Sequence, residues 1–317
     1  MSASVPRVAT IIPAYNGADL LGGALESVLA QTYGDWEAVV VDDASHDHTL
    51  EVAGSFAERD RRVTVVHLDA NVGVGAARTA GVRRSGGGEL LCLLDQDDLW
   101  DERYLERTVA AYDDAVASGR RVGIVSSNAL MLTDDGVTGE TWWDRNGWVE
   151  PVDLKAMLRH NYLNARSLFT RSAYEDAGGE FARDLGGSDD YDLWLRILEQ
   201  GYEAIGVPEP LATYRDHAGS FSRDKLAMAD GLIECYRRAL GRGALSGRQR
   251  RVVRAQVRHW HALRHRELLR RAVAGRRPLP ALRHGAWCVP YGIAAFAQDP
   301  GRWREWGRDL TRSGGRS

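Results

Sequence analysis

Short apolar segments alternate with segments of helical periodicity over the first 126 residues, and this alternation constrains the fold more than any other feature of the sequence. Segments of four or five residues that are rich in leucine or β-branched residues are typical of strands buried on both faces of a parallel sheet. The pattern predicts an α/β fold in which a Rossmann-like, mostly parallel sheet is flanked by helices. The expected strands are residues 8–12, 38–41, 63–67, 90–94 and 122–126.

The regular alternation stops after residue 126. Residues 127–165 are irregular, and beyond them we expect a helix near 190–200 and a short strand near 203–207. After residue 222 the pattern becomes helical and rich in arginine. The expected division is one domain over residues 1–222, with halves at 7–126 and 127–222, and a helical, basic C-terminal extension over 223–317.

The C-terminal extension differs in charge from the rest of the chain. Residues 241–317 contain 18 Arg, no Lys and four acidic residues, a net charge of +14 in a chain whose total is -3. This asymmetry predicts peripheral contact with an anionic membrane; a solvated arginine-rich helical face is the alternative. Four tryptophans among the arginines suit a membrane interface: Trp260, Trp287, Trp303 and Trp306.

The cysteines and the apolar segments restrict the compartment. Cys92, Cys235 and Cys288 are widely spaced and odd in number, which argues against a disulfide framework. We expect no signal peptide, because the first residues lack a basic stretch followed by an apolar segment, and the apolar segment 286–297 is too short to span a bilayer. We expect a cytoplasmic protein, with any membrane contact on the inner face. Nucleic acid is not an expected partner, because the body is acidic and the extension lacks a nucleic-acid-binding motif.

Three acidic clusters lie where predicted strands end or a helix begins. They are Asp42-Asp43, Asp95-Gln96-Asp97-Asp98 and Asp189-Asp190. The carboxyl ends of parallel strands share one edge of a sheet, and ligands bind at that edge. Carboxylates gathered there repel one another unless a cation joins them, and Mg²⁺ or Mn²⁺ suits such oxygens together with substrate phosphates. The clusters predict a divalent metal and a phosphate-bearing substrate.

Each cluster also has a structural alternative, because Asp is a preferred N-cap and turn residue. Asp97 or Asp98 could cap a helix beginning near Asp101, Asp47 could cap one near His48, and Asp189 could cap the helix that follows it. The occurrence of all the clusters in one order favours a binding site over separate caps.

Five sequence blocks resemble those of the family 2 glycosyltransferases, which have the GT-A fold. They are Thr10-Ile-Ile-Pro-Ala-Tyr-Asn16, Val40-Val-Asp-Asp-Ala-Ser45, Asn71-Val-Gly-Val-Gly-Ala-Ala-Arg78, Leu94-Asp-Gln-Asp-Asp98 and Asp189-Asp-Tyr-Asp-Leu-Trp-Leu-Arg196. The resemblance implies an inverting glycosyltransferase of hexosyl- or N-acetylhexosaminyl-transferase type. Such an enzyme transfers a sugar from a nucleotide-diphosphate donor, usually a UDP sugar, to an acceptor hydroxyl.

The resemblance also implies roles for individual residues. Asp97 would bind Mg²⁺ or Mn²⁺ on the diphosphate, with His217 as a second ligand. Asp190 would be the catalytic base, and Asp189 is its rival because the sequence does not decide which neighbour points inward. Residues 7–126 would form the nucleotide-binding half and 127–222 the acceptor-side half. The nucleotide sugar would be held by Pro13, Ala14, Tyr15, Asn16, Asp42, Asn71, Arg78, Asp95 and Gln96.

The chemistry of sugar transfer agrees with these roles. Negative charge develops on the departing diphosphate, where a metal stabilises it. The acceptor hydroxyl loses its proton as it attacks, and a carboxylate is the usual base. A single displacement with one base and no enzyme nucleophile inverts the anomeric centre. Gln96 departs from the family pattern, because relatives often carry a small residue there, and this leaves the identity of the sugar open.

Aromatic residues in the irregular segment provide a candidate acceptor site. Trp142, Trp143 and Trp148 could form a platform for a sugar ring, or they could cover the core. The acceptor could be a glycan, a lipid-linked sugar or a small molecule. His46, His48 and His67 lack metal-ligand spacing and are expected at the surface or in turns.

Two other functions fit parts of the sequence. A sugar nucleotidyltransferase would need a glycine-rich, basic loop after the first strand, where this chain has Pro13-Ala-Tyr-Asn-Gly17. A non-catalytic glycan- or nucleotide-binding scaffold with a docking tail is the second alternative. The presence of every expected acid argues against it.

Overall fold

The computed structural model describes residues 5–275 of the 317-residue chain. The chain divides into two compact units, one ending at Arg223 and one beginning at Asp224. Trp287, Trp303 and Trp306 therefore lie outside the described residues.

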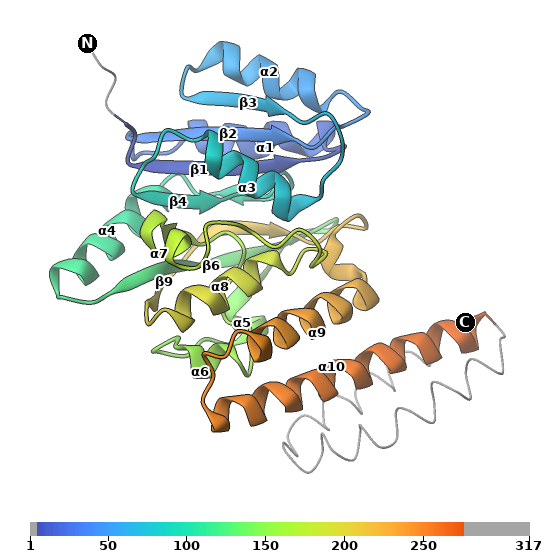
Figure 1. Cartoon of the computed structure of the whole chain (residues 1–317). Coiled ribbons are helices and arrows are strands. Elements are labelled where there is room, and N and C mark those ends of the chain that lie inside the picture. Colours follow the sequence, from blue (N-terminus) through green and yellow to red (C-terminus); the bar gives the residue numbers. More distant parts are fainter. Residues whose placement is uncertain (1–4, 276–317) are drawn as a thin grey trace. The chain divides into compact units, whose positions relative to one another are not determined.

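A single nine-stranded sheet forms the frame of the first unit (Figure 1). Eight strands follow the order β3-β2-β1-β4-β8-β6-β9-β5, and β7 pairs with β6. The first four strands in this order are parallel, β8 is antiparallel to both of its neighbours, and β9 is parallel to β6. The strands are β1 (Val8–Ala14), β2 (Trp36–Asp42), β3 (Val63–His67), β4 (Leu90–Leu93), β5 (Leu99–Trp100), β6 (Val122–Thr133), β7 (Gly136–Thr141), β8 (Leu168–Thr170) and β9 (Glu203–Arg215).

The expected α/β fold is confirmed, and the five expected strands correspond to β1, β2, β3, β4 and β6. The strand expected near 203–207 is longer than predicted, because β9 continues to Arg215 alongside β6. It contains Pro208 and Pro210, and the register of β6 against β9 shifts around Asn128. Prolines of this kind are tolerated in a strand where pairing is irregular.

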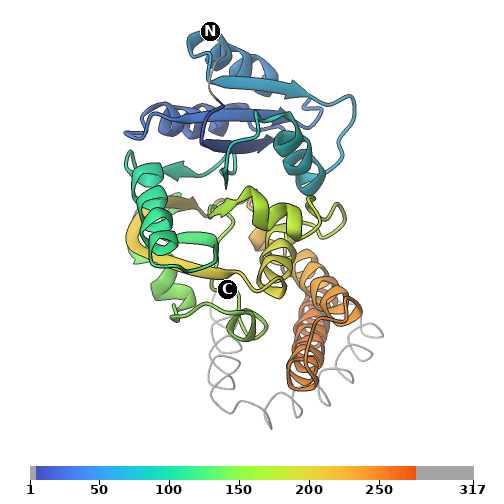
Figure 2. The same cartoon turned by 60° about the vertical axis from the view of Figure 1, so that its left-hand side comes forward.

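Helices cover both faces of this sheet (Figures 1 and 2). Helix α3 packs on β1 and β2, and Gly81 allows the close approach, because a Cβ there would lie 2.4 Å from Ile11 Cγ2. On the other face, residues of α1, α2 and α4 join the main hydrophobic core. The helices of this unit are α1 (Ala18–Leu29), α2 (Thr49–Arg59), α3 (Val74–Arg84), α4 (Tyr104–Ala117), α5 (Trp142–Asn146), α6 (Leu154–Met157), α7 (Arg171–Asp176), α8 (Asp189–Glu199) and the 3₁₀ helix η1 (Phe221–Arg223).

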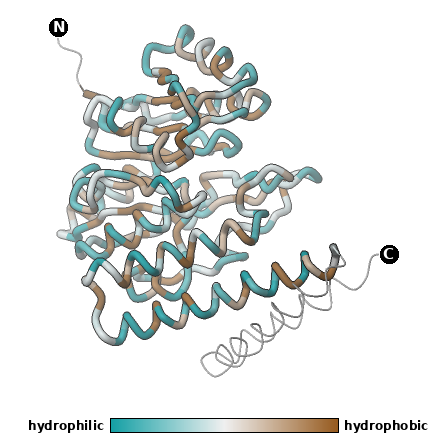
Figure 3. Tube along the Cα trace, turned by 45° about the vertical axis from the view of Figure 1, so that its right-hand side comes forward, coloured by the Kyte–Doolittle hydropathy of each residue, from teal (hydrophilic) through white to brown (hydrophobic). Residues whose placement is uncertain are grey.

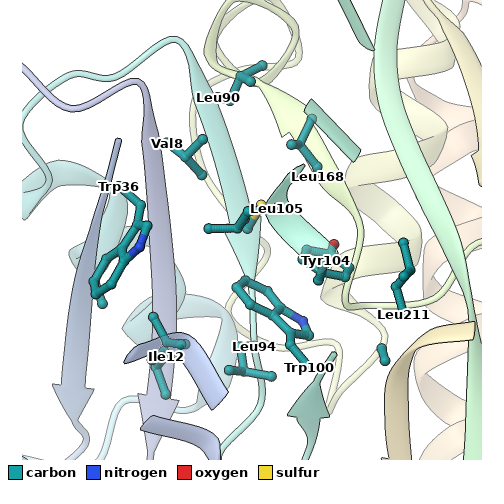
Figure 4. Close-up of a cluster of buried hydrophobic side chains, with 14 of the residues drawn as sticks. Val8, Ile12, Trp36, Leu90, Leu94, Trp100, Tyr104, Leu105, Leu168 and Leu211 are labelled. Carbon is teal, nitrogen blue, oxygen red and sulfur yellow. The ribbon is translucent and has the colours of Figure 1, made fainter. Parts of the chain in front are cut away.

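The core under the strand ends is apolar and closely packed (Figure 4). Val8 and Ile12 of β1 are fully buried, and the ring of Trp100 stacks on that of Tyr104 with centroids 4.2 Å apart. Burial of each side chain of this size stabilises the folded chain by roughly 1.5–3 kcal/mol. The core thereby fixes the β1, β2 and β4 ends, from which the polar loops project.

The second unit consists of two helices as far as the structure describes it. Helix α9 (Lys225–Gly241) packs on α10 (Gly247–Ala274), which begins with a capping box between Ser246 and Gln249. Hydrophilic residues recur along α10 (Figure 3). Within residues 5–275, no helix has the length and apolar character to cross a membrane.

Candidate donor and catalytic site

Two loops, at the ends of β1 and β2, are joined by hydrogen bonds. The Asn16 amide donates to Ser45 Oγ (3.0 Å), and the His46 amide donates to Asn16 Oδ1 (2.9 Å). Asn16 and Ala44 both adopt positive φ angles, 47° and 58°. Non-glycine residues rarely hold this conformation unless their surroundings impose it, and such residues cluster at functional sites. The loops therefore form a fixed face at the edge of the sheet.

The two acids after β2 differ in their availability. Both oxygens of Asp43 accept main-chain N–H groups, from Val72 at 2.8 Å and Gly73 at 2.9 Å. Asp42 is fully buried, and its Oδ2 lies 2.7 Å from His67 Nδ1. Its Oδ1 is buried and has no hydrogen-bond partner within the described residues. Asp43 thus holds the chain after β3, whereas Asp42 retains an acceptor atom.

Arg78 lies between two acidic clusters. Its Nη2 donates to Asp95 Oδ1 at 2.6 Å and its Nη1 donates to Asp189 Oδ2 at 2.8 Å. The side chain projects from α3 and is buried. Burial lowers the pKa of Arg78 by desolvation, but the combined attraction of Asp189, Asp95 and Asp190 is stronger, so the pKa is raised. Both terminal nitrogens thus bind carboxylates, and each keeps a second N–H group. Asn71 donates to the Asp43 carbonyl at 3.4 Å.

Asp97 and His217 face each other across 120 positions of sequence. His217 Nε2 lies 2.9 Å from Asp97 Oδ2, and Arg215 donates to the Asp97 carbonyl. Among residues 5–275, no group of three or more His, Cys, Asp or Glu side chains is placed to hold a metal. Mg²⁺ commonly binds only one or two protein ligands and completes its shell with phosphate oxygens and water. The Asp97 carboxylate fits this mode for Mg²⁺ or Mn²⁺, and the His217 imidazole lies beside it.

Asp98 neither caps a helix nor faces solvent. Its Oδ2 pairs with Arg166 Nη1, both side chains are buried, and its Oδ1 accepts the Arg215 amide at 3.0 Å. The Arg166 guanidinium also lies over the Tyr214 ring, 4.9 Å from its centroid. Helix α4 begins later, at Tyr104, without a side-chain cap. The capping alternative is therefore wrong for Asp97 and Asp98. Asp47 accepts the Thr49 amide at the start of α2, but the N-cap residue of that helix is His48.

The two acids at the start of α8 are in different environments. Asp189 is bound to Arg78, whereas Asp190 accepts the Tyr191 amide at 2.7 Å and has no cationic partner within hydrogen-bonding distance in the described residues. The pKa of Asp190 is raised to about 7, by burial first and by the negative charge of Asp189 second, against the opposing effect of Arg78. A carboxyl group with this pKa can accept a proton near neutral pH. Helix capping by Asp189 is wrong, because the N-cap residue is Ser188.

The three tryptophans of the irregular segment do not form one exposed platform. Trp143 and Trp148 stack on each other with centroids 4.2 Å apart, and both approach Gly206 of β9. Trp142 packs edge-on against Tyr214 at 5.8 Å, and its ring centroid lies 5.7 Å from the Arg166 guanidinium. Trp142 is therefore in contact with Tyr214, beside the carboxylate cluster. Trp143 and Trp148 instead pack on each other and near β9.

Several residues of this cluster belong to no motif of the sequence. Arg166 stands alone before a short strand and carries no motif, although an arginine beside an apolar strand signals a buried ion pair. Arg215 precedes His217, and its contact with Asp97 depends on the length of β9. His67 was expected at the surface or in a turn. Its side chain is 47% exposed, but it ends β3 and contacts Asp42 on the neighbouring strand.

Comparison with known proteins agrees with this geometry. The sequence model described as Glycosyl transferase family 2 matches residues 9–178. The succinoglycan biosynthesis protein ExoO of Rhizobium meliloti (strain 1021) is 29% identical over 286 residues, covering 86% of this chain and 80% of ExoO. WfaP of Escherichia coli, a UDP-Glc:alpha-D-GlcNAc-diphosphoundecaprenol beta-1,3-glucosyltransferase, is 27% identical over 221 residues, 69% of this chain and 80% of WfaP.

A solved structure supports the fold. The mannosyltransferase PcManGT from Pyrobaculum calidifontis, in complex with GDP-Man and Mn²⁺, has a TM-score of 0.61 and 23% identity, covering 94% of this chain and 88% of that chain. At this identity the likeness bears on the fold alone, and it confirms the GT-A architecture. Because the family match spans more than half of the 317 residues, the chain belongs to glycosyl transferase family 2 and is a glycosyltransferase.

Proposed function

We propose that the enzyme transfers a hexosyl or N-acetylhexosaminyl unit from a UDP sugar to an acceptor hydroxyl, with inversion and by a single displacement. The observation that carries the proposal is the contrast between Asp189, which is bound to Arg78, and the neighbouring Asp190, whose pKa is raised to about 7. A buried carboxyl group without an ion-pair partner at hydrogen-bonding distance is suited to accept the acceptor's proton. Asp190 is thus favoured as the base, with Asp189 as its neighbour in the Arg78 pair.

Asp42 supports the nucleotide part of the proposal. Its unpartnered Oδ1 is an acceptor that a nucleobase N–H could satisfy, and burial makes an unsatisfied acceptor costly, by about 1–3 kcal/mol. Tyr15, in the adjoining loop, is 41% exposed and could contact the nucleobase of the donor. The name of WfaP specifies a UDP sugar, and the PcManGT complex contains GDP-Man, so both nucleotides belong in the test.

Asp97 and His217 would hold Mg²⁺ or Mn²⁺ at the diphosphate. When bound, such an ion neutralises the charge that develops on the departing nucleotide diphosphate. The ring nitrogen of His217 orients the Asp97 carboxylate, and Arg215 holds the Asp97 main chain. These contacts keep the carboxylate in one place before the donor arrives.

The names of ExoO and WfaP favour a polysaccharide or another glycoconjugate as the pathway product. The acceptor would then be a glycan or a lipid-linked sugar, with small molecules as the alternative. Trp142 is the best-placed aromatic residue for the acceptor, because it contacts Tyr214 next to the carboxylates.

The basic extension is proposed to contact an anionic membrane from the cytoplasmic side. The four acids of residues 224–275 all pair with arginines, namely Asp224, Asp230, Glu234 and Glu267. Arg251, Arg254 and Arg258 are exposed on α10 at spacings of three and four, and within the described residues they have no ion-pair partner. Arginines on one helical face can bind lipid phosphates.

The test is nucleotide binding followed by donor turnover. We expect UDP to raise the melting temperature of the purified protein only with Mn²⁺ or Mg²⁺, and GDP, dTDP and ADP to raise it less. Release of UDP from a UDP sugar should then require Asp190. Binding without any turnover in the presence of candidate acceptors would favour the non-catalytic scaffold instead.

A further inference from the structure

The Gln96 side chain forms two reciprocal hydrogen bonds with the main chain of Tyr15. Its Oε1 accepts the Tyr15 N–H at 2.9 Å, and its Nε2 donates to the Tyr15 carbonyl at 3.1 Å. Gln96 belongs to the loop after β4, and Tyr15 to the loop after β1. A carboxamide that donates to and accepts from one residue fixes both its position and its rotation. The two bonds therefore join the nucleotide-side loop to the loop that carries Asp97.

The neighbouring N–H groups are held from another direction. Those of Asn16, Gly17 and Ala18 donate to side chains of the segment after β2, which are Ser45 Oγ, Thr49 Oγ1 and Asp47 Oδ2. Four consecutive main-chain donors thus have side-chain partners. Of these partners, Gln96 is the one from the β4 side.

Gly17 provides the space that the Gln96 carboxamide occupies. A Cβ at position 17 would lie 2.1 Å from Oε1, 2.4 Å from Cδ and 2.7 Å from Nε2 of Gln96. The backbone angles of Gly17, φ -122° and ψ 25°, do not themselves require glycine. Glycine is therefore needed here for room, and alanine would displace the carboxamide.

We propose that Gln96 is a positioning residue of the donor site, which sets the distance between Tyr15 on the nucleoside side and Asp97 on the diphosphate side. Oε1 and Nε2 of Gln96 each bind the main chain of Tyr15, so Gln96 can act on the donor through Tyr15. A fixed distance between the two sides favours a nucleotide of one size. The inference rests on the proposed function and names a determinant of nucleotide preference within it.

The experiment uses the full chain and four variants. Gln96→Ala removes both hydrogen bonds, Gly17→Ala displaces the carboxamide, and the double variant combines them. Gln200→Ala is the matched control, because Gln200 is an exposed residue at the end of α8, outside the site. The readouts are the Kd values of UDP and GDP with Mn²⁺, the kcat and KM of UDP release from a UDP sugar, and the melting temperature without nucleotide.

We expect Gln96→Ala to weaken UDP binding by about 5- to 150-fold, the range for loss of two neutral hydrogen bonds. KM for the donor should rise with little change in kcat, and the ratio of UDP to GDP affinity should fall. Gly17→Ala should have a similar effect. The double variant should bind UDP as tightly as Gln96→Ala alone, because truncation of the Gln96 side chain leaves the space beside position 17 free. If the two substitutions acted independently, their losses of binding free energy would add.

Additive losses, or a Gln96→Ala variant that keeps wild-type Kd and KM, would overturn the inference. An unchanged UDP-to-GDP ratio alongside a lowered melting temperature would also overturn it, because that result indicates a structural role alone. Failure of UDP, GDP, dTDP and ADP to bind the wild-type protein would instead overturn the proposed function, and this inference with it.

Discussion

Replacement of Arg78 by methionine tests whether one cation holds the two acidic clusters together. The substitution keeps much of the volume of the side chain but removes its charge from between Asp95 and Asp189. The Asp189 side chain is 1% exposed, so its charge would stay in the interior without a partner. Breaking a buried ion pair by removing one partner costs about 3–5 kcal/mol.

The expected cost converts into a large change in melting temperature. For a unit of this size, 1 kcal/mol corresponds to about 2–4 °C, so the Arg78→Met variant should melt roughly 6–20 °C below the wild type. Arg84→Met is the matched control, because Arg84 is exposed on the same helix and has no ion pair within the described residues. Surface substitutions of this kind change stability by less than about 0.5 kcal/mol.

Differential scanning calorimetry of the purified variants gives the measurement. Adding Asp95→Asn and Asp189→Asn to Arg78→Met should recover a large part of the loss, because the triple variant also removes the two carboxylate charges that Arg78 binds. A melting temperature of Arg78→Met within 2 °C of Arg84→Met would refute the reasoning, as would a triple variant less stable than Arg78→Met.

Three further predictions concern activity and the extension. Asp190→Asn should lower donor turnover by about 10²–10⁴ while nucleotide binding persists, and wild-type turnover should rise as the pH passes through about 7, because Asp190 is a carboxylate only above its raised pKa; equal turnover at pH 5.5 and 8 would contradict this. Asp97→Ala should abolish the Mn²⁺-dependent rise in melting temperature caused by UDP, and a retained rise would reject Asp97 as a metal ligand. In flotation with vesicles containing phosphatidylserine, replacement of three exposed arginines of α10 by glutamine should reduce binding by about a hundredfold, at about 1 kcal/mol each. The α10 set is Arg251, Arg254 and Arg258, and the control set in the first unit is Arg61, Arg83 and Arg84. Replacement of the control set should leave vesicle binding unchanged. Equal losses of binding for the two sets would reject α10 as the membrane-binding surface.

The parallel strands could be predicted because each is a short buried apolar run, and burial leaves a local signal in the sequence. The place of β8 could not, because the order of strands in a sheet depends on contacts between distant segments. The length of β9 was missed because Pro208 and Pro210 argue against a strand, and only the irregular pairing with β6 accommodates them.

The acidic positions of the site were visible in the sequence, but their partners were not. Asp189 and Asp190 are adjacent residues of the same type, so the sequence does not distinguish them. In the folded chain, the contact between Arg78 and Asp189 distinguishes their environments. Similarly, nothing near Asp98 indicates Arg166, which lies 68 positions later. Ion pairs of this kind form only in the folded chain, and a sequence motif contains only one of the two residues in each pair.

The pairing of Asp98 also bears on the order in which the chain can assemble during synthesis. Its two partners, the Arg166 side chain and the Arg215 main chain, leave the ribosome 68 and 117 residues after it. A nascent chain that ends near residue 160 has most of its parallel strands but holds an uncompensated carboxylate at their edge. Folding of this half during synthesis should therefore remain incomplete until both partners have emerged, and a chain truncated at that point should be less stable than the complete unit.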